Sequence, residues 1–442
     1  MLAASEFYEI NSGDTAWVLG SAALVLFMTP GLAFFYGGMV RSKNVLAILM
    51  QNYITIGIVS VVWVICQFTL AFGGGNSIIG DLHYAGLANT AANRALNSGA
   101  ALTVPILAFA MFQLMFAVIT PALFTGSIAD RMKFAPFLVI IVLWSLLVYA
   151  PIAHWVWAPT GWLFKLGAED FAGGTVVHAN AGAAGLALAI VLGRRKGWPK
   201  EPMRPHNLPF VLLGAAMLWF GWFGFNAGSA LAANGLASVA FVNTNTATAA
   251  AMLGWVLTEK IRDGHPTTLG AASGAVAGLV AITPACGFIS PMGSIVLGLV
   301  AGSVCCLATG LKFRFGFDDA LDVVGVHLVG GVLGALLIGV IGTSAFNALA
   351  QEGLLSGGGF ALLGKQTVAV LASVTYSFVV TFLIAKVVGL LFGGLRVSED
   401  VEVEGLDVNL HAETGYEIGQ LGGSFRSSAA SSAARDSAGV SA

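Results

Sequence analysis

Two histidines in apolar segments are the residues of this chain best suited to chemistry. His178 ends the stretch DFAGGTVVH, which begins at Asp170. His327 ends the stretch DALDVVGVH, which begins at Asp319. A titratable side chain inside a membrane is costly and marks a functional site by default. Since every Asp and Glu falls in a loop, in a tail or at the end of an apolar segment, the two imidazoles predict the handling of a species that gains or loses a proton.

Long apolar helices must carry these histidines. Of the 442 residues, 57% are hydrophobic and 10% are charged, whereas a soluble domain carries about 25% charged residues. The composition predicts an all-α polytopic membrane protein, and a sequence without a basic patch excludes nucleic acid as a partner. A helix that crosses the bilayer core needs about 20 apolar residues. Eleven segments are expected to cross, of which the eighth is short and rich in glycine: 15–36, 45–72, 99–128, 135–157, 171–192, 208–228, 241–257, 268–285, 291–311, 322–344 and 366–395.

The basic residues of the loops predict how these segments are oriented. Alternate loops contain thirteen arginines and lysines, whereas the opposite set contains three. Because basic residues favour the cytoplasmic side, we expect residues 1–14 outside the cell and a regulatory tail, residues 396–442, in the cytoplasm. The protein would then lie in the plasma membrane. The Ser/Ala/Gly-rich end of the tail, 422–442, has a composition typical of disorder.

The two aspartate–histidine segments fall in the fifth and tenth expected spans, 171–192 and 322–344. Five is odd, so a second copy of a five-helix unit enters the membrane from the opposite side. Eight residues place each histidine about 12 Å from its own face, within a hydrocarbon core about 30 Å thick. Both imidazoles therefore approach the midplane, as in inverted-repeat transporters. The expected units form one membrane domain, 15–395, with a first repeat at 15–192, a second at 208–344 and an eleventh helix at 366–395.

Aromatic residues gather near the expected outer ends of the same helices. Trp157 ends the fourth span, Phe112 and Phe116 lie one helical turn apart in the third, and Phe225 precedes Ser229 in the sixth. One interpretation is an aromatic belt at the membrane interface. The other is a cage for a small cation, because aromatic faces attract cations.

Asp170 begins the fifth span, and two roles fit a carboxylate at this position. Its side chain can cap the N-terminus of the helix. Its charge can also raise the cation concentration at the mouth of a pore. Both roles can hold together.

With these residues the chain resembles the ammonium transporters of the Amt/Mep/Rh family, on the Amt side, from about residue 15 to 417. Seven stretches carry the resemblance: PGLAFFYGGMVRSKN, DFAGGTVVHANAGAAGLALAIVLG, PHNLP, WFGFNAGS, TPACG, GVHLVGG and GLDVNLHAE. The resemblance implies eleven spans and a homotrimer with one pore in each subunit. Relatives use the tail to engage a PII-type signal protein or as a site of phosphorylation. The common tail pattern, HGE followed by Ala-Tyr, reads HAETGY here, with Ala412 and Gly415, so this partner stays open.

The resemblance also assigns roles to individual residues, and none of these roles involves a metal or a cofactor. His178 and His327 would be the twin histidines of the pore, with Phe116 and Phe225 as a stacked gate above them. The residues that recruit ammonium, or lie beside that site, would be Trp157, Phe116, Ser229, Asp170, Phe112, Gln113 and Thr283.

Together these observations predict an ammonium transporter and not an enzyme. We expect the protein to recruit ammonium at the outer aromatic site, remove a proton, and conduct ammonia, with or without the proton, past the histidines. A dry pore would exclude potassium because an intact cation is costly to move through an apolar constriction. The alternatives are an ammonium sensor that signals through the tail, a channel for neutral solutes, and an intramembrane metalloenzyme, for which the sequence offers no third ligand at this depth.

Overall fold

The computed structural model describes residues 9–90, 95–97 and 101–416, and these residues form a bundle of helices. The expected disorder of 422–442 and much of the expected outer segment, 1–14, lie outside the described residues. The fold class expected from composition is therefore confirmed as all-α, since only a short antiparallel pair of strands accompanies the helices in the described part of the chain.

The elements follow the apolar segments of the sequence, with short turns of other helix types between them. The α-helices are α1 (Ser12–Met39), α2 (Val45–Val62), α3 (Phe68–Phe72), α4 (Ile106–Ile128), α5 (Phe134–Trp144), α6 (Ala150–Trp157), α7 (Trp162–Leu166), α8 (Asn180–Leu192), α9 (Leu208–Gly228), α10 (Gly235–Asp263), α11 (Thr268–Ile282), α12 (Pro291–Ala308), α13 (Leu311–Phe315), α14 (Val329–Ile341), α15 (Ala361–Leu391), α16 (Glu399–Glu404) and α17 (Leu406–His411). The remaining elements are the π-helical turns η2 (Trp63–Gln67), η4 (Ser145–Tyr149), η5 (Gly174–Ala179) and η6 (Val324–Leu328), the 3-10 turns η1 (Ser42–Asn44), η3 (Ala85–Leu87) and η7 (Leu354–Ser356), and the strands β1 (Ala95–Asn97) and β2 (Ala101–Pro105).

Ten helical stretches among the described residues are long and apolar enough to cross a membrane. They are α1, η1 to α3, α4, α5 to α7, η5 with α8, α9, α10, α12 with α13, η6 with α14, and α15. The eighth expected span corresponds to α11, which has 15 residues. At about 1.5 Å per residue this helix reaches only about 22 Å, so the eleventh crossing stays a prediction.

Two of the expected boundaries shift in the structure, each for a local reason. The third span was expected from residue 99, but α4 begins at Ile106 because residues 101–105 pair as strand β2. The eleventh span was expected at 366–395, whereas α15 ends at Leu391. Gly393 and Gly394 follow it with φ of 60° and 98°, a left-handed conformation that terminates helices and favours glycine.

The centre of the bundle is α4, which is buried along nearly its whole length. Its sequence is apolar on all sides, and a helix without a polar face is stable only when neighbours enclose it or lipid surrounds it. It contacts α1, α2 and α8. The aromatic residues expected in the third span therefore point into protein and not into a lipid-facing belt.

Small residues bring the two histidine-bearing segments together. A Cβ atom added at Gly182 would lie 2.4 Å from the backbone nitrogen of Leu328, and one added at Gly331 would lie 3.0 Å from the Cβ of His178. Neither distance leaves room for a side chain, so both glycines are required by packing. Close backbone approach of this kind is how helices associate in lipid.

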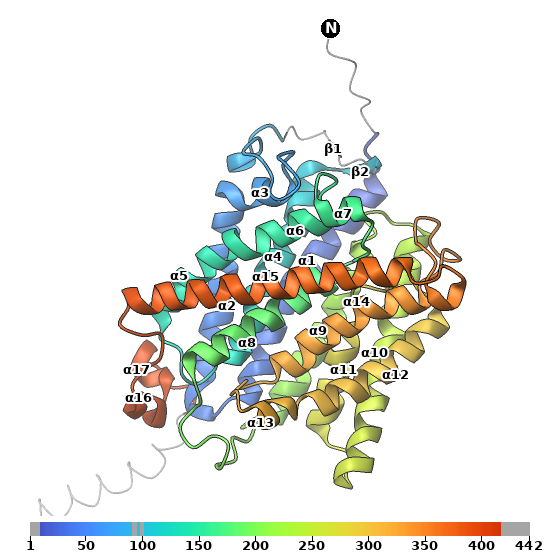
Figure 1. The fold of residues 1–442 in the computed structure, drawn as a ribbon. Helices are drawn as coiled ribbons and strands as arrows, with labels where there is room; N and C mark the ends of the chain where they lie inside the picture. The colour runs from blue at the N-terminus through green and yellow to red at the C-terminus, as the bar shows by residue number, and fades with distance from the viewer. Residues whose placement is uncertain (1–8, 91–94, 98–100, 417–442) are drawn as a thin grey trace, which may run out of the picture.

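Figure 1 shows the helices as one bundle with two distinct ends. The end that carries β1, β2, α3 and α7 is called the vestibule end here, and the end that carries α13, α16 and α17 is called the tail end. The long helix α15 runs across one face of the bundle and contacts α5, α8 and α14. The segment from Asp170 to Leu192 runs from the vestibule end to the tail end, and the segment from Asp319 to Ile341 runs the opposite way, as an inverted repeat requires.

Candidate functional site

His178 and His327 face each other inside the bundle. Their Nδ1 atoms are 3.3 Å apart, and their ring centroids are 5.5 Å apart at an interplanar angle of 18°. Both residues are buried. One ring nitrogen must donate and the other accept, so the two imidazoles take complementary tautomers when both are neutral. The structure thus brings the pair together, while the relay role stays a prediction.

Each histidine lies in a π-helical turn, η5 or η6, at the start of its segment. Such turns are rare and occur frequently at functional sites. The aspartate that precedes each turn anchors it. The Asp319 carboxylate accepts hydrogen bonds from the Val324 backbone N–H at 2.7 Å and from the Ser127 hydroxyl at 2.8 Å. The spacing of eight residues therefore places a capping carboxylate before each histidine.

Asp170 caps η5 with a complete set of donors. Its carboxylate accepts backbone N–H groups from Gly173 at 2.7 Å, Gly174 at 2.6 Å, Thr175 at 2.8 Å and Val176 at 3.2 Å, together with the Thr175 hydroxyl. The side chain is buried beside this turn. Of the two roles expected for Asp170, its contacts therefore support capping of the helix.

An aromatic cavity of about 320 Å³ opens at the vestibule end above the histidines. Trp157, Phe116, Gln113 and Ser229 line it together with Phe171 and Tyr84. The rings of Phe116 and Trp157 meet edge to face with centroids 5.8 Å apart. Four of the seven residues expected at a recruiting site thus share one cavity.

Two of these residues present groups that suit a cationic hydrogen-bond donor. The Ser229 hydroxyl donates to the Phe225 carbonyl at 2.8 Å, so its oxygen keeps lone pairs for a ligand. The Gln113 side-chain oxygen is buried and has no hydrogen-bond partner within the described residues. The Trp157 indole N–H donates to the Asp170 carbonyl at 3.0 Å, which fixes the ring at the cavity wall.

The other three expected residues lie outside the cavity lining. The Asp170 side chain points toward the backbone N–H groups of the turn that follows it. Phe112 packs against Phe116 with ring centroids 4.9 Å apart. The Thr283 hydroxyl accepts the Trp222 indole N–H at 2.8 Å, at the level of the histidines and not at the mouth. These three positions therefore support neighbouring residues.

Phe116 lines the cavity and packs against Phe225, and this pair is called the floor here. Their ring centroids are 4.2 Å apart, and both side chains are buried. Phe225 also lies 6.1 Å from the ring of His178. A much smaller cavity of about 20 Å³ touches His327 from the tail side and is lined by Tyr36 and Asp322, among others. Phe116 thus borders one cavity and His327 borders the other.

Trp222, the first residue of the stretch WFGFNAGS, is a site residue to which sequence reasoning gave no role. Its ring stacks on His178 with centroids 5.3 Å apart and an angle of 15°. Trp222 lies three residues before Phe225, which places both side chains on one face of the helix. This spacing was the signal in the sequence that could have identified Trp222. Because its indole N–H is bonded to Thr283, Trp222 is held in place and restrains the His178 ring.

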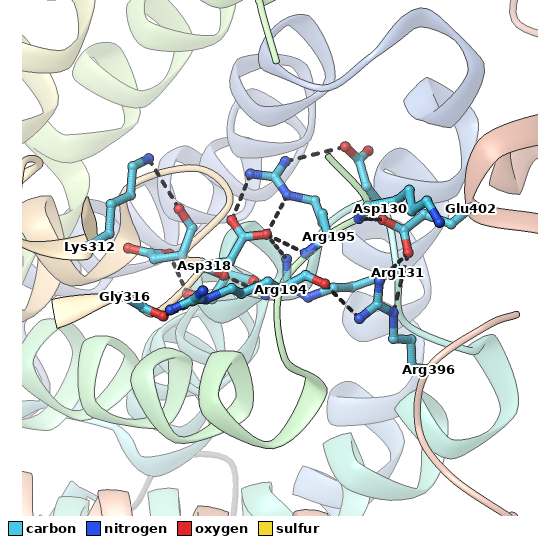
Figure 2. A network of polar contacts seen from close by, with 12 residues as sticks. Asp130, Arg131, Arg194, Arg195, Lys312, Gly316, Asp318, Arg396 and Glu402 are labelled. Atoms are coloured by element: carbon cyan, nitrogen blue, oxygen red, sulfur yellow. Dashed lines mark hydrogen bonds and ion pairs between the residues drawn. The ribbon is translucent and has the colours of Figure 1, made fainter. Parts of the chain in front are cut away.

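A buried charge network occupies the tail end (Figure 2). Arg195 contacts Asp318 at 2.9 Å and Asp130 at 3.3 Å, and Arg131 contacts Asp318 at 3.2 Å. Burial lowers the pKa of Arg131 to about 10. Removing one member of such a network leaves a buried charge uncompensated and is strongly destabilising.

The tail connects to this network. Glu402 is fully buried and accepts the Lys196 backbone N–H at 2.7 Å and the Arg396 guanidinium at 2.5 Å. Farther along, Asp407 accepts the backbone N–H groups of Leu46 and Ala47 at 3.0 and 2.8 Å. The short helices α16 and α17 are therefore docked on the tail end of the bundle.

The structure does not present a metal centre in the part of the chain that it describes: no group of three His, Cys, Asp or Glu side chains is placed to hold an ion. The four cysteines, Cys66, Cys286, Cys305 and Cys306, are free thiols. This arrangement offers no support for the metalloenzyme alternative.

Helices that cross a membrane and enclose a narrow aromatic path past buried histidines define a membrane transport protein with its path inside one chain. Residues 16–416 match the family described as the Ammonium Transporter Family. The ammonium transporter of Mycobacterium tuberculosis (strain H37Rv) is 52% identical over 440 residues, covering 94% of this chain and 92% of the relative. This chain therefore belongs to the ammonium transporter family, which is a family of membrane transporters and not of enzymes.

Solved structures agree with this assignment. The crystal structure of Saccharomyces cerevisiae Mep2 superimposes with a TM-score of 0.83 at 36% identity and covers 89% of each chain. A structure titled as a sensor Amt protein is also similar, with a TM-score of 0.82 at 29% identity, covering 90% of this chain and 98% of the other. The fold is thus shared with both.

Glu169, next to Asp170, is a buried carboxylate that sequence reasoning did not single out. It accepts the Gln351 backbone N–H at 2.7 Å, and its own N–H donates to the Gln366 side chain at 2.7 Å. Burial raises its pKa from 4.5 to about 7. Glu169 thus holds the loop before α15, and α15 itself, against the start of the histidine-bearing segment.

We expect the stability of this clamp to fall as pH rises. The folded protein keeps a proton on Glu169 that the unfolded chain releases between about pH 4.5 and 7, so stability decreases through that window. Across the whole window, this pKa shift should lower the free energy of unfolding by about 3 kcal/mol. In thermal unfolding of the purified protein at about pH 5.5 and pH 8, Glu169→Gln should remove most of the pH dependence.

The matched control is Glu352→Gln, an exposed carboxylate in the same loop whose pKa is lowered by hydrogen bonds from Ser344. Glu352 titrates below this pH window, so the Glu352→Gln variant should retain the pH dependence of wild-type stability. An unchanged pH slope in Glu169→Gln would show that the clamp does not titrate there.

Proposed function

We propose that this protein recruits ammonium at the vestibule end, removes a proton, and conducts ammonia past the histidine pair. The observation that carries the proposal is the position of two mutually bonded, buried imidazoles next to the packed rings of Phe116 and Phe225. A membrane transporter of this family needs a way to reject other monovalent cations, and a dry path with a relay for protons meets that need.

Recruitment depends on the cavity walls. Faces of tryptophan and phenylalanine attract cations by about 0.5–2 kcal/mol, and Trp157 and Phe116 supply them. The free lone pairs of Ser229 and Gln113 accept N–H groups, which ammonium carries and potassium lacks. The cavity therefore favours a small cation that donates hydrogen bonds.

Selectivity depends on the closed floor. An ion pays a large desolvation cost to enter an apolar space without partners, whereas neutral ammonia does not. In this proposal the packed rings of Phe116 and Phe225, whose centroids are 4.2 Å apart, keep water in the cavity away from His178. Deprotonation before this floor thus separates ammonium from potassium.

Beyond the floor, the histidines are the titratable groups that lie next to Phe225, and Tyr36 and Asp322 line the small cavity that touches His327. The Nε2 atom of His178 is buried and has no partner there, so it is available to a passing ammonia molecule. The bond between the two Nδ1 atoms links that site to His327. A proton can move along this link when the tautomers exchange.

The same proposal includes the setting of the protein. We place the tail end in the cytoplasm because the basic loop residues gather there, and the vestibule end outside the plasma membrane. The membrane domain, 15–395, would form a homotrimer, and the docked tail, from residue 396, would regulate it. The buried contacts of Glu402 and Asp407 support a regulatory position for the tail, through a PII-type protein or phosphorylation.

Flux in reconstituted vesicles tests the proposal. Purified protein in liposomes should move ammonium at a saturable rate, measured by labelled uptake and by current in the same preparation. Binding of ammonium without flux would favour the sensor alternative, to which the similar sensor Amt structure and the docked tail give weight. High water permeability without saturation by ammonium would favour a channel for neutral solutes.

We expect Phe116→Ala combined with Phe225→Ala to open the floor to water. Both rings are buried and in contact, and their loss creates a space next to polar histidines that water can occupy. Potassium leak and water permeability should rise at least tenfold, which stopped-flow light scattering and ion flux assays measure. The control is Phe220→Ala, an exposed ring on the same helix, which should leave both rates unchanged. A floor variant that still excludes potassium would contradict the dry-floor mechanism.

A further inference from the structure

His154 is a buried histidine near the end of α6, and it does not line the aromatic cavity. Its Nδ1 atom lies 2.9 Å from the Ala71 carbonyl oxygen, and its Nε2 atom lies 2.7 Å from the Asn76 carbonyl oxygen. The Thr160 hydroxyl lies 3.2 Å from the same Nε2 atom. The ring therefore joins α6 to the loop that follows α3, at the vestibule end (Figure 1).

The two carbonyls together need two donors from this ring. Among the described residues, His154 is the only group that can donate to either oxygen. A neutral imidazole has one N–H donor and one acceptor nitrogen. If it donated to Ala71 and accepted the Thr160 hydroxyl, its Nε2 lone pair would face the Asn76 carbonyl at 2.7 Å. A buried acceptor left in this way is unfavourable, so the contacts fit an imidazolium, which has two donors.

The position of the ring also favours a positive charge. The helical stretch Ser42–Phe72 ends one residue after Ala71, and α6 ends at Trp157, three residues after His154. Carbonyl groups in the last turn of a helix carry partial negative charge and stabilise a cation there. Asp81, the carboxylate of the adjoining loop, is exposed and accepts backbone N–H groups of that loop. Two helix C-termini thus compensate a charge on His154.

The two carbonyls bracket part of the cavity wall. Residues 72–74 lie between them and line the cavity, and Trp157 lines it from α6. The neighbour of His154 supports the same junction, because the Trp155 indole N–H donates to the Ile78 carbonyl at 2.8 Å. The end of α6 therefore holds both ends of this stretch of wall.

We propose that His154 is a positioning residue for ammonium recruitment, and that it acts as an imidazolium whose two N–H groups hold residues 72–74 against the end of α6. This role rests on the proposed recruitment of ammonium in the aromatic cavity. Because His154 does not line the cavity, it acts through the shape of the wall. Loss of one donor frees one end of the wall and weakens the close contacts that a cation makes with aromatic faces.

Histidine-selective ¹⁵N labelling of the full-length protein tests the charge state. At about pH 7 we expect both ring nitrogens of His154 to carry a proton, whereas a neutral ring shows one protonated and one bare nitrogen. The chain has seven histidines, and the signal of His154 is the one that disappears in His154→Gln. If that variant does not fold, Thr160→Val identifies the signal, because it changes the surroundings of this ring.

Thr160→Val also separates the two protonation states. The variant removes the hydroxyl beside Nε2, which an imidazolium does not need as a donor. Both N–H signals should therefore persist. A neutral His154 ring in the wild type, or a second N–H that disappears in Thr160→Val, would overturn the proposal.

The kinetics of ammonium uptake in liposomes test the positioning role. The amide of His154→Gln can donate to one carbonyl but presents its oxygen to the other. We expect the half-saturating ammonium concentration to rise about tenfold, the factor that corresponds to one charge-assisted hydrogen bond, while the maximal rate per folded protein stays the same. His83→Gln, an exposed histidine at the same end, should leave both values unchanged.

The other outcomes of this measurement contradict the proposal. A half-saturating concentration that stays the same or falls in His154→Gln would show that the residue does not position the recruiting wall. A lower maximal rate without a change in half-saturation would show a general structural role instead. If the wild type binds ammonium without flux, the proposed transport fails separately, and calorimetric titration of the purified proteins gives the same comparison of affinities.

Discussion

Replacing His178 and His327 together by leucine is expected to abolish ammonium-specific flux while the protein still folds. The two rings satisfy each other through one hydrogen bond at 3.3 Å. Substituting apolar groups for both partners of a buried hydrogen bond is nearly neutral for stability, whereas removing one partner leaves the other unsatisfied. The double variant should therefore be more stable than either single variant.

The expected loss of flux is large because leucine has no ring nitrogen that could accept or donate the proton. Positioned acid–base groups contribute about 10²- to 10⁴-fold to proton transfer, so uptake should fall at least about a hundredfold. Labelled uptake and current in liposomes measure the change. His265→Leu, an exposed histidine in a tail-end loop, is the control. Unchanged flux with continued exclusion of potassium in the double variant would refute the relay.

Asp170→Ala is expected to have the second largest effect, on both stability and flux. The carboxylate accepts four backbone N–H groups in the turn that positions His178. Each buried donor left without an acceptor costs about 1–3 kcal/mol, so the loss should exceed about 3 kcal/mol. The backbone carbonyl of Asp170 itself accepts the Trp157 indole N–H, so the vestibule wall should loosen when the turn does.

A companion variant separates the two roles of Asp170. Asp170→Asn keeps one acceptor oxygen but removes the charge. Its amide NH₂ group would face the backbone N–H groups that the second carboxylate oxygen now accepts. If capping is the role, Asp170→Asn should be destabilised and should lose flux at every ammonium concentration. If attraction of cations is the role, the Asp170→Asn variant should keep its stability and should lose flux mainly at low ammonium and low salt. The control for both is Asp263→Ala, an exposed residue at the end of α10, with an expected change within about 0.5 kcal/mol.

The aspartate–histidine spacing shows how far sequence reasoning reached into the site. Helical rise alone predicted that His178 and His327 lie at similar depth, and the structure places their rings in contact. The same reasoning left two roles open for Asp170, because spacing does not reveal which way a carboxylate turns. Only the folded turn shows five donors around it.

Residues that act through tertiary contact were beyond reach of sequence patterns. Trp222 stacks on His178, and Glu169 holds Gln351 far along the chain. Neither partner lies within one helical turn of the other, so no local period connects them. The length of α11, in contrast, could be anticipated from the sequence, because the eighth expected span was already short and rich in glycine.

By itself, the sequence determined the class of this protein, the order of its membrane helices, their expected orientation and the residue types on the path. These features follow from apolar runs, helical rise and loop charge, all of which are local properties. The tertiary structure decided which of those residues meet: the Phe116–Phe225 floor and the docked tail around Glu402. Such contacts depend on how distant helices pack, and packing is set by the complementary shapes of many side chains at once.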